Sequence, residues 1–495
     1  MNAHPARTTL HEGLGRLADR GLVREDAFVD GRWVAGKARF AVTDPADGRV
    51  LAHVASLGAD QAGAAIDAAA AAFPAWAALL PQERSAALLG WHDGIVAARE
   101  DLAILMSLEQ GKPLAEARGE IDYAASFVAY YAEEAKRVCV ESVASHLVGA
   151  EMRLTRRPVG IAGLVTPWNF PSAMLTRKAA AALAAGCTAV AHPSSETPLS
   201  ALALAELASR AGLPAGVLNV VTGDAATIVG RLCADARVRA MSFTGSTAVG
   251  RLVAAQCAPT MKRLVMELGG HAPLIVFADA DLDRAVEIAI DAKFATSGQD
   301  CLAANRIFVE RRVFDAFAEA FARRAGSLKV AAGLVDGAEI GPLMHERAVA
   351  KCEAHVADAL ARGARLLCGG ARHPAGPLFY EPTVLADVPA DAAIMREETF
   401  GPVAALAAFD TEAEILTRAN DTEYGLVAYL VTRDGPRAAR MSAALDYGMV
   451  AVNRVKITGA PIPFGGTKQS GLGREGARHG LEAFTDLQYV CLDRG

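Results

Sequence analysis

Hydrophobic and polar positions follow two different periods along this chain. Between residues 59 and 137 apolar residues recur at helical spacing, as in AIDAAAAAFPAWAALL and ERSAALLGWHDGIVAARE. From residue 159 onward, short β-rich runs such as VGIAGLV, CTAVAH and RAMSFTG alternate with helical stretches such as ALALAELASRAG. Strands that alternate with helices of this length predict βαβ units around a buried, mainly parallel sheet, which is the α/β fold class.

A second alternating series follows residue 267 and predicts a second α/β domain. It begins with PLIVF and RIFVE and ends with LVAYLVT and MVAVN. The tail FTDLQYVCLD has the alternation of a strand but no partner near it in the sequence. A terminal strand of that kind commonly pairs elsewhere in the chain or on another subunit.

Composition and charge exclude several classes of protein. The 495 residues carry a formal net charge of −6, with Lys and Arg scattered, whereas nucleic-acid binders cluster their cations. The longest apolar run, residues 179–191, is shorter than the roughly 18 residues of a membrane span, and the N-terminus lacks the apolar core of a signal peptide. Eight cysteines without CxxC spacing indicate free thiols, so we expect a cytoplasmic protein.

One motif in the sequence is misleading. Gly471-Leu-Gly473-Arg-Glu-Gly476 fits the dinucleotide fingerprint GxGxxG, but the preceding PFGGTKQS is a loop where the fingerprint requires a strand. We therefore interpret it as a structural turn. The sequence contains no P-loop, no HExxH and no GxSxG, and we expect no metal.

Three polar segments stand out against this background. Asn169 lies in GLVTPWNFP, Glu267 in MELGGHAP and Cys301 in SGQDCLAANR. Taken singly, each has an ordinary explanation. A lone Cys is more often a small buried apolar residue, a Glu at the end of a strand is usually solvated, and an Asn in a turn serves the backbone. Their combination is what points to chemistry.

The sequence resembles the aldehyde dehydrogenase superfamily from about residue 25 to its end, through TPWNFP, FTGST, MELGG, GQDC, EETFGPV and PFGGTKQSGLGREG in that order and spacing. The resemblance implies a Rossmann-type cofactor domain, an α/β catalytic domain and a small β oligomerisation extension. The corresponding residues are 1–137 with 155–266, then 267–478, and 138–154 with 479–495. It also implies a homodimer or homotetramer.

The resemblance implies NAD(P)⁺-dependent oxidation of an aldehyde to a carboxylic acid. The thiolate of Cys301 would make the planar aldehyde carbon tetrahedral, and a thioester would remain once hydride has left. The side-chain amide of Asn169 and the backbone N–H of Cys301 would stabilise the oxyanion, and Glu267 would be the general base that activates water. Lys178 and Glu475 match a family pair linked to proton movement, although a plain ion pair explains them equally.

The resemblance also implies an NAD or NADP site along the first sheet. The matching residues are Thr166, Trp168, Phe243, Gly245, Ser246, Glu398 and Phe400. At the adenosine end, His192 and Ser195 stand where the family has Lys and Glu. Loss of that carboxylate favours NADP, whereas a neutral His192 weakens attraction to a 2′-phosphate, so the preference stays open.

Within the superfamily, NFPSAMLTRKAAAALAAGC, ANDTEYGLVAY and GLGREG are most similar to succinate-semialdehyde dehydrogenases. That group holds the far carboxylate of its substrate with two arginines and a hydroxyl. One arginine matches Arg177, but the other position holds Ala295. The remaining candidates for substrate contact are Lys456 or Arg454 in place of the missing cation, Thr458 and Phe464. The alternatives are a dehydrogenase for another aliphatic or aromatic aldehyde and a catalytically silent binding protein on the same fold.

Overall fold

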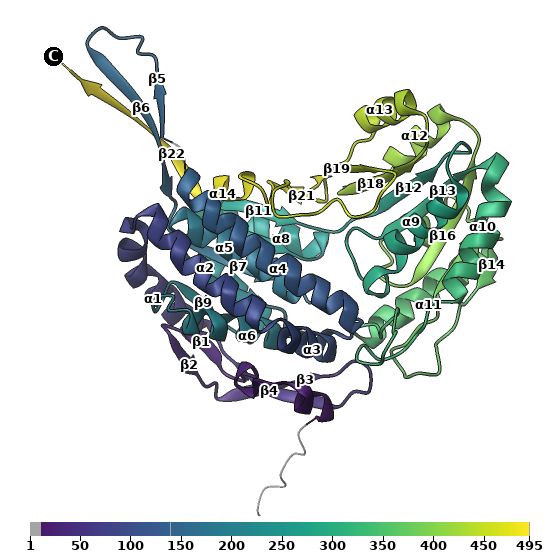
Figure 1. Ribbon diagram of the computed structural model, residues 1–495, viewed down its shortest axis with the longest axis horizontal. Helices are drawn as coiled ribbons and strands as arrows, with labels where there is room; N and C mark the ends of the chain where they lie inside the picture. The colour runs from purple at the N-terminus through teal and green to yellow at the C-terminus, as the bar shows by residue number, and fades with distance from the viewer. Residues whose placement is uncertain (1–10, 139, 495) are drawn as a thin grey trace, which may run out of the picture.

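The computed structural model describes residues 11–138 and 140–494. The predicted free thiol of Cys139, the start of the predicted segment 1–137 and the end of the predicted segment 479–495 lie outside the described residues. Two α/β bodies lie side by side, and a narrow β extension projects from the first (Figure 1). Both large sheets are mainly parallel. The predicted α/β class is confirmed.

The first sheet has eight strands in the order β2-β1-β9-β8-β7-β10-β11-β21. Its five central strands run parallel, and every residue of β7 and β8 is buried. The strands are β1 (Ala27–Val29), β2 (Arg32–Val34), β7 (Ile161–Thr166), β8 (Thr188–Pro193), β9 (Leu218–Val220), β10 (Val238–Thr244), β11 (Arg263–Glu267) and β21 (Gly471–Leu472).

Eight helices accompany this sheet. The three helices predicted between residues 59 and 137 are present as α1, α2 and α4, and α3 lies between the last two. Helix α5 starts with a proline and ends before Gly186, whose φ of 93° suits glycine at a helix end. Its alanine-rich sequence is buried throughout, because small side chains let the helix pack closely on both sides. The helices are α1 (Ala59–Ala78), α2 (Pro81–Ala97), α3 (Arg99–Gln110), α4 (Leu114–Glu134), α5 (Pro171–Ala185), α6 (Pro198–Arg210), α7 (Ala225–Ala234) and α8 (Thr247–Cys257).

The second sheet has seven strands in the order β14-β15-β16-β13-β12-β18-β19. They are β12 (Ala272–Val276), β13 (Ala304–Glu310), β14 (Arg365–Cys368), β15 (Thr383–Ala386), β16 (Val403–Phe409), β18 (Val427–Val431) and β19 (Met449–Val452). Its helices are α9 (Leu282–Phe294), α10 (Arg311–Gly326), α11 (Glu346–Ala361), α12 (Glu412–Asn420) and α13 (Gly435–Ala444). The chain then returns to the first sheet, where β21 pairs with β11.

The tail strand finds its partner within its own chain. β22 (Thr485–Asp493) pairs antiparallel with the whole of β6 (Ala150–Pro158), and β5 (Val140–Val143) completes the projecting sheet (Figure 1). The strand β6 continues past residue 154, where we placed the end of the oligomerisation segment. The division into domains remains a prediction.

Apart from the buried helix α3, the elements that sequence analysis missed are short or exposed. β1 and β2 have three residues each, and β3 (Ala38–Thr43) pairs with β4 (Val50–Ser56) outside the main sheets with most of its residues exposed. Such strands lack the buried alternation on which strand prediction depends. The remaining small elements are β17 (Tyr424–Gly425), β20 (Thr467–Lys468) and α14 (His479–Glu482).

Two further predictions can be compared with the fold. The GxGxxG segment has a structural role, but it begins as a strand where we expected a turn. Gly471 belongs to the edge strand β21, and a Cβ there would lie 1.9 Å from the carbonyl oxygen of Met266. The seven described cysteines are free thiols, as expected. Over residues 11–138 and 140–494, no helix has the length and apolar character needed to cross a membrane.

Candidate active site

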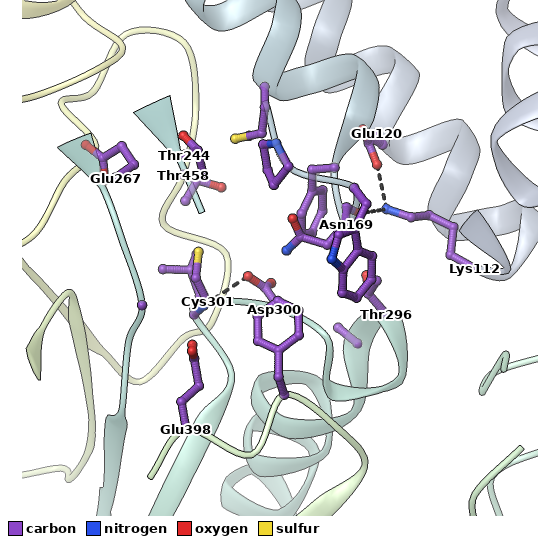
Figure 2. A pocket seen from close by; sticks show the side chains of 18 of the residues that line it. Lys112, Glu120, Asn169, Thr244, Glu267, Thr296, Asp300, Cys301, Glu398 and Thr458 are labelled. Carbon is purple, nitrogen blue, oxygen red and sulfur yellow. Dashed lines mark hydrogen bonds and ion pairs between the residues drawn. The ribbon is translucent and has the colours of Figure 1, made fainter. Parts of the chain in front are cut away.

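A cavity of about 940 Å³ lies between the two bodies and contains all three candidate catalytic residues. Asn169 follows β7 and Glu267 ends β11, so both lie at the carboxyl edge of the first sheet. Cys301 precedes β13, at the amino edge of the second sheet. In Figure 2, Asn169, Glu267 and Glu398 surround Cys301 on three sides. Residues that are distant in sequence therefore meet because the two sheets face each other at these edges.

The loop before Cys301 is held in an unusual backbone conformation. Thr296 and Ser297 have φ values of 52° and 58°, which non-glycine residues rarely adopt. The Glu116 carboxylate accepts hydrogen bonds from the Thr296 backbone N–H and hydroxyl, and the Ser297 hydroxyl donates to the carbonyl of Gly341 at 3.0 Å. These contacts fix the loop and place the thiol in the cavity.

The thiol of Cys301 is partly exposed to the cavity but surrounded by acids. Burial raises its pKa well above the ordinary value, and Asp300 and Glu398 raise it further, whereas Arg177 opposes them. Asp300 shares a side-chain hydrogen bond with Cys301 (Figure 2). The thiol is therefore protonated at neutral pH in this structure, and its activation requires a base or an added positive charge.

Asn169 is buried and points its amide toward Cys301 (Figure 2). Its Nδ2 donates to the carbonyl of Gln299 at 3.0 Å. The buried Lys112 donates to the backbone carbonyl of Asn169 at 2.8 Å and to Glu120 at 2.5 Å. Sequence reasoning missed Lys112, which lies in the loop between α3 and α4, and Glu120, which lies within α4, because a charge in or beside a helix is not a specific signal.

The carboxyl group of Glu267 is 2% exposed, and neither of its oxygens has a hydrogen-bond partner among the described residues. Burial raises its pKa well above the ordinary value, and Glu475 raises it further, against the opposing charges of Arg177 and Lys178. A Cβ at Gly465 would lie 2.8 Å from its Oε1, so the glycine leaves room for this side chain. An unpaired buried carboxyl is available to a water molecule that enters the cavity.

Gly270 brings the backbone of the second body against the candidate nucleophile. A Cβ at this position would lie 2.3 Å from the carbonyl oxygen of Cys301. We expect Gly270→Ala to displace the Cys301 loop and to lower kcat/KM by at least about 5-fold, because overpacking a fixed backbone typically costs 1–3 kcal/mol. Steady-state kinetics and a thermal melt would measure both effects.

Gly230→Ala is the matched control for this prediction. Gly230 lies in α7, and a Cβ there meets nothing within 4 Å. This variant should keep wild-type activity, because alanine is more favourable than glycine in a helix interior. Wild-type activity in Gly270→Ala would show that the loop tolerates the displacement.

The cavity also has the features of a dinucleotide site. Ser246 caps α8 and lines the cavity together with Gly245, so the start of this helix lies at the cavity. A Cβ at Gly245 would lie 2.6 Å from the Phe243 ring. The rings of Trp168 and Phe400 meet edge to face at 5.5 Å. These donors and apolar rings fit a phosphate group and a flat aromatic ring.

Glu398 completes this end of the cavity. Its Oε1 accepts the backbone N–H of Gly270 at 3.0 Å, and burial raises its pKa to about 7. The second oxygen has no hydrogen bond among the described residues and can accept one from a sugar hydroxyl. The donor set is therefore compatible with NAD or NADP.

Four predicted cofactor contacts do not line the cavity: Thr166, His192, Ser195 and Phe243. His192 is buried in β8, where its Nδ1–H donates to the carbonyl of Val221 at 2.8 Å, and burial lowers its pKa. It is therefore neutral and carries no charge toward a 2′-phosphate. Ser195 is exposed, and the hydroxyl of Thr166 is buried without a partner among the described residues.

The predicted substrate residues Arg177, Lys456, Thr458 and Phe464 all line the other end of the cavity. Arg177 is buried, its Nε forms an ion pair with Glu475 at 2.6 Å, and its guanidinium lies 4.2 Å from the centre of the Phe464 ring. Its Nη1 has no hydrogen-bond partner among the described residues. The other candidate cation, Arg454, does not line the cavity; its Nε donates to the carbonyl of Lys456.

Lys178 and Glu475 lie directly behind Arg177 and Glu267. Lys178 forms a buried ion pair with Glu475, and Ser242 donates to the same carboxylate at 2.8 Å. Burial alone would raise the pKa of Glu475, but Lys178 and Arg177 outweigh it and hold that pKa at about 2. Glu475 is therefore ionised at neutral pH.

Comparison with known proteins gives a consistent result. The sequence model of the aldehyde dehydrogenase family matches residues 33–490. The non-phosphorylating aspartate-semialdehyde dehydrogenase of Halomonas elongata is 52% identical over 96% of this chain and 97% of its own. The NADP(+) succinate-semialdehyde dehydrogenase of Escherichia coli is 50% identical over 96% of this chain and 99% of its own.

Solved structures agree with these sequence matches. The succinate-semialdehyde dehydrogenase of Burkholderia pseudomallei has a TM-score of 0.96 at 50% identity, covering 97% of this chain and 100% of its own. The betaine aldehyde dehydrogenase of Staphylococcus aureus, solved with NAD+, has a TM-score of 0.93 at 32% identity, covering 96% and 97%. The fold that the sequence predicts is the fold of these structures.

Proposed function

The chain belongs to the aldehyde dehydrogenase family, and from that premise we propose that it oxidises a carboxylated semialdehyde, succinate semialdehyde or a near relative, to the dicarboxylate. The enzyme uses NAD or NADP. The substrate assignment rests on one observation: the Nη1 of Arg177 is a buried cationic donor at the cavity with no partner among the described residues. A buried unpaired donor of this kind favours a ligand that supplies an anion.

The residues that fit the dinucleotide are those described above. Ser246 and the start of α8 would hold the pyrophosphate, Glu398 the sugar hydroxyls, and Trp168 and Phe400 the ring. When bound, NAD(P)⁺ supplies the hydride acceptor. The neutral His192 and the exposed Ser195 favour neither NAD nor NADP decisively, so both remain in the proposal.

Cys301 is the proposed nucleophile. Once a base has taken the thiol proton, the sulfur attacks as the thiolate and bonds to the aldehyde carbon. The carbonyl oxygen then becomes an oxyanion that accepts hydrogen bonds from the Asn169 amide and the Cys301 backbone N–H. Loss of one such donor typically lowers the rate about 10²–10³-fold. Lys112 and Gln299 hold Asn169 in place, so the amide is oriented before the substrate binds.

Glu267 is the proposed general base for hydrolysis of the thioester. Its unpaired carboxylate would take a proton from water as the water oxygen attacks the acyl carbon and the Cys301 sulfur leaves. The ionised Glu475 and the ammonium of Lys178 lie behind it and keep its surroundings polar. The Cys301 thiol is thereby restored with release of the acid.

A pair of substrates of equal chain length tests the substrate assignment. We expect kcat/KM for succinate semialdehyde to exceed that for butyraldehyde by about 100-fold, because a buried charge-assisted contact is typically worth 2–5 kcal/mol. Reduction of NAD⁺ or NADP⁺ measures both rates. Equal kcat/KM values would contradict a carboxylate-binding site and would favour the alternative of a dehydrogenase for an uncharged aldehyde.

We further propose a homodimer or homotetramer that assembles through the extension of β5, β6 and β22. Its exposed apolar side chains support this, and they include Val148, Leu487 and Tyr489. The free thiols of the described cysteines support a reducing compartment, for which the cytoplasm is our proposal.

A further inference from the structure

The substrate end of the cavity carries a carboxylate that the proposed reaction does not use. Asp291 lies in the last turn of α9, and both Asp291 and Ala295 line the cavity. Lys456 lines it as well. No hydrogen bond or ion pair joins the Asp291 carboxylate or the Lys456 ammonium to another side chain within residues 11–138 and 140–494. Both side chains are exposed, so two opposite charges reach the same cavity without a direct ion pair.

These two charges are close enough to influence each other. Burial raises the pKa of Asp291, and Glu287 raises it further, while Lys456 and Arg324 oppose the increase. Lys456 belongs to the loop that also carries Thr458, and Thr458 and Arg177 both contact Tyr123. Asp291 and Lys456 thus lie at the same end of the cavity as Arg177.

An unpaired carboxylate at this position works against a substrate whose only charge is negative. A second arginine at position 295 would neutralise it, but Ala295 carries no charge. Like charges brought together cost free energy, and a cation supplied by the substrate would remove that cost.

We propose that Asp291 binds a positively charged group of the substrate, so that the enzyme prefers a semialdehyde with an ammonium group beside its carboxylate, as in aspartate semialdehyde. Arg177 and Lys456 would hold the carboxylate and Asp291 the ammonium. The inference rests on the proposed function, because it assumes that Arg177 binds the carboxylate. Aspartate semialdehyde has the carbon chain of succinate semialdehyde plus one ammonium, so the ratio of their kcat/KM values isolates this contact.

The experiment measures that ratio in the wild-type enzyme, in Asp291→Asn and in Asp283→Asn. Asp283 lies on the same helix, is exposed and does not line the cavity, so its variant makes the same change of charge away from the substrate. We expect Asp291→Asn to lower the aspartate-to-succinate ratio about 10-fold, since one partly exposed charge contact is worth about 1.4 kcal/mol. Asp283→Asn should leave the ratio unchanged.

A second variant tests the same contact without removing Asp291, so a loss of activity caused by that removal cannot affect it. Ala295→Arg supplies the cation that the position lacks, and it should shift the ratio toward succinate semialdehyde. Because both rates come from one variant, a general loss of folded enzyme cancels in the ratio.

The outcomes separate this inference from the proposed function. An unchanged ratio in Asp291→Asn, or an equal fall in both rates, overturns the role of Asp291 even when succinate semialdehyde is preferred to butyraldehyde. Equal rates for succinate semialdehyde and butyraldehyde in the wild-type enzyme overturn the proposed function itself, and the inference with it.

Discussion

Replacing Cys301 with alanine is expected to abolish aldehyde oxidation, with a loss of kcat of at least about 10⁴-fold, while cofactor binding stays intact. Without the sulfur no covalent adduct forms, and hydride has no tetrahedral carbon to leave. The substitution removes one atom at a side chain that is partly exposed to the cavity, so the fold should be unaffected. Production of NAD(P)H measures turnover, and calorimetric titration with the cofactor measures binding.

Cys368→Ala is the matched control for this variant. Cys368 is also a partly exposed free thiol, but it lies on the edge strand β14 and does not line the cavity. Its variant should keep wild-type turnover. If Cys301→Ala instead retained measurable steady-state oxidation, the covalent route would be wrong, and another group would have to activate the aldehyde.

Sequence patterns predicted the elements that bury a regular face. The helices between residues 59 and 137, and strands such as β7 and β8, are buried enough to show a clear period or a continuous apolar run. The strand β3 was missed because it is mostly exposed, and exposure removes the constraint that produces a pattern. The partner of β22 was indicated only by the family resemblance, which grouped residues 138–154 with 479–495. The alternation of residues alone could not show it, since pairing between residues 150–158 and 485–493 depends on the path of the whole chain.

The same limit applies to the site. Asn169, Glu267 and Cys301 could be singled out because each lies in a short polar segment that the family motifs mark. Lys112, Glu116 and Asp291 carry no such mark, because they lie in or beside ordinary helical segments and reach the cavity only through helix packing. Conversely, His192 was expected at the cofactor, but its side chain turns into the sheet and bonds to Val221.

The Glu267→Gln variant is expected to release about one NAD(P)H per active site and then to stall at the thioester, with steady turnover lowered about 10²–10⁴-fold. Glutamine has the size of glutamate, so the contact with Gly465 is preserved while the base is lost. Rapid-mixing measurements of NAD(P)H give the size of the burst. Mass spectrometry of the stalled enzyme should find the acyl group on Cys301.

The pH dependence of the wild-type enzyme checks the same assignment. Because burial raises the pKa of Glu267, and a general base acts only when deprotonated, hydrolysis should slow as the pH falls through that raised pKa. The glutamine variant should lose this dependence, and hydroxylamine should restore its turnover, since a strong nucleophile attacks a thioester without a base. Steady turnover in this variant, with no burst and an unaltered pH profile, would mean that another group takes the proton. Asp300, which shares a hydrogen bond with Cys301, would then be the first candidate.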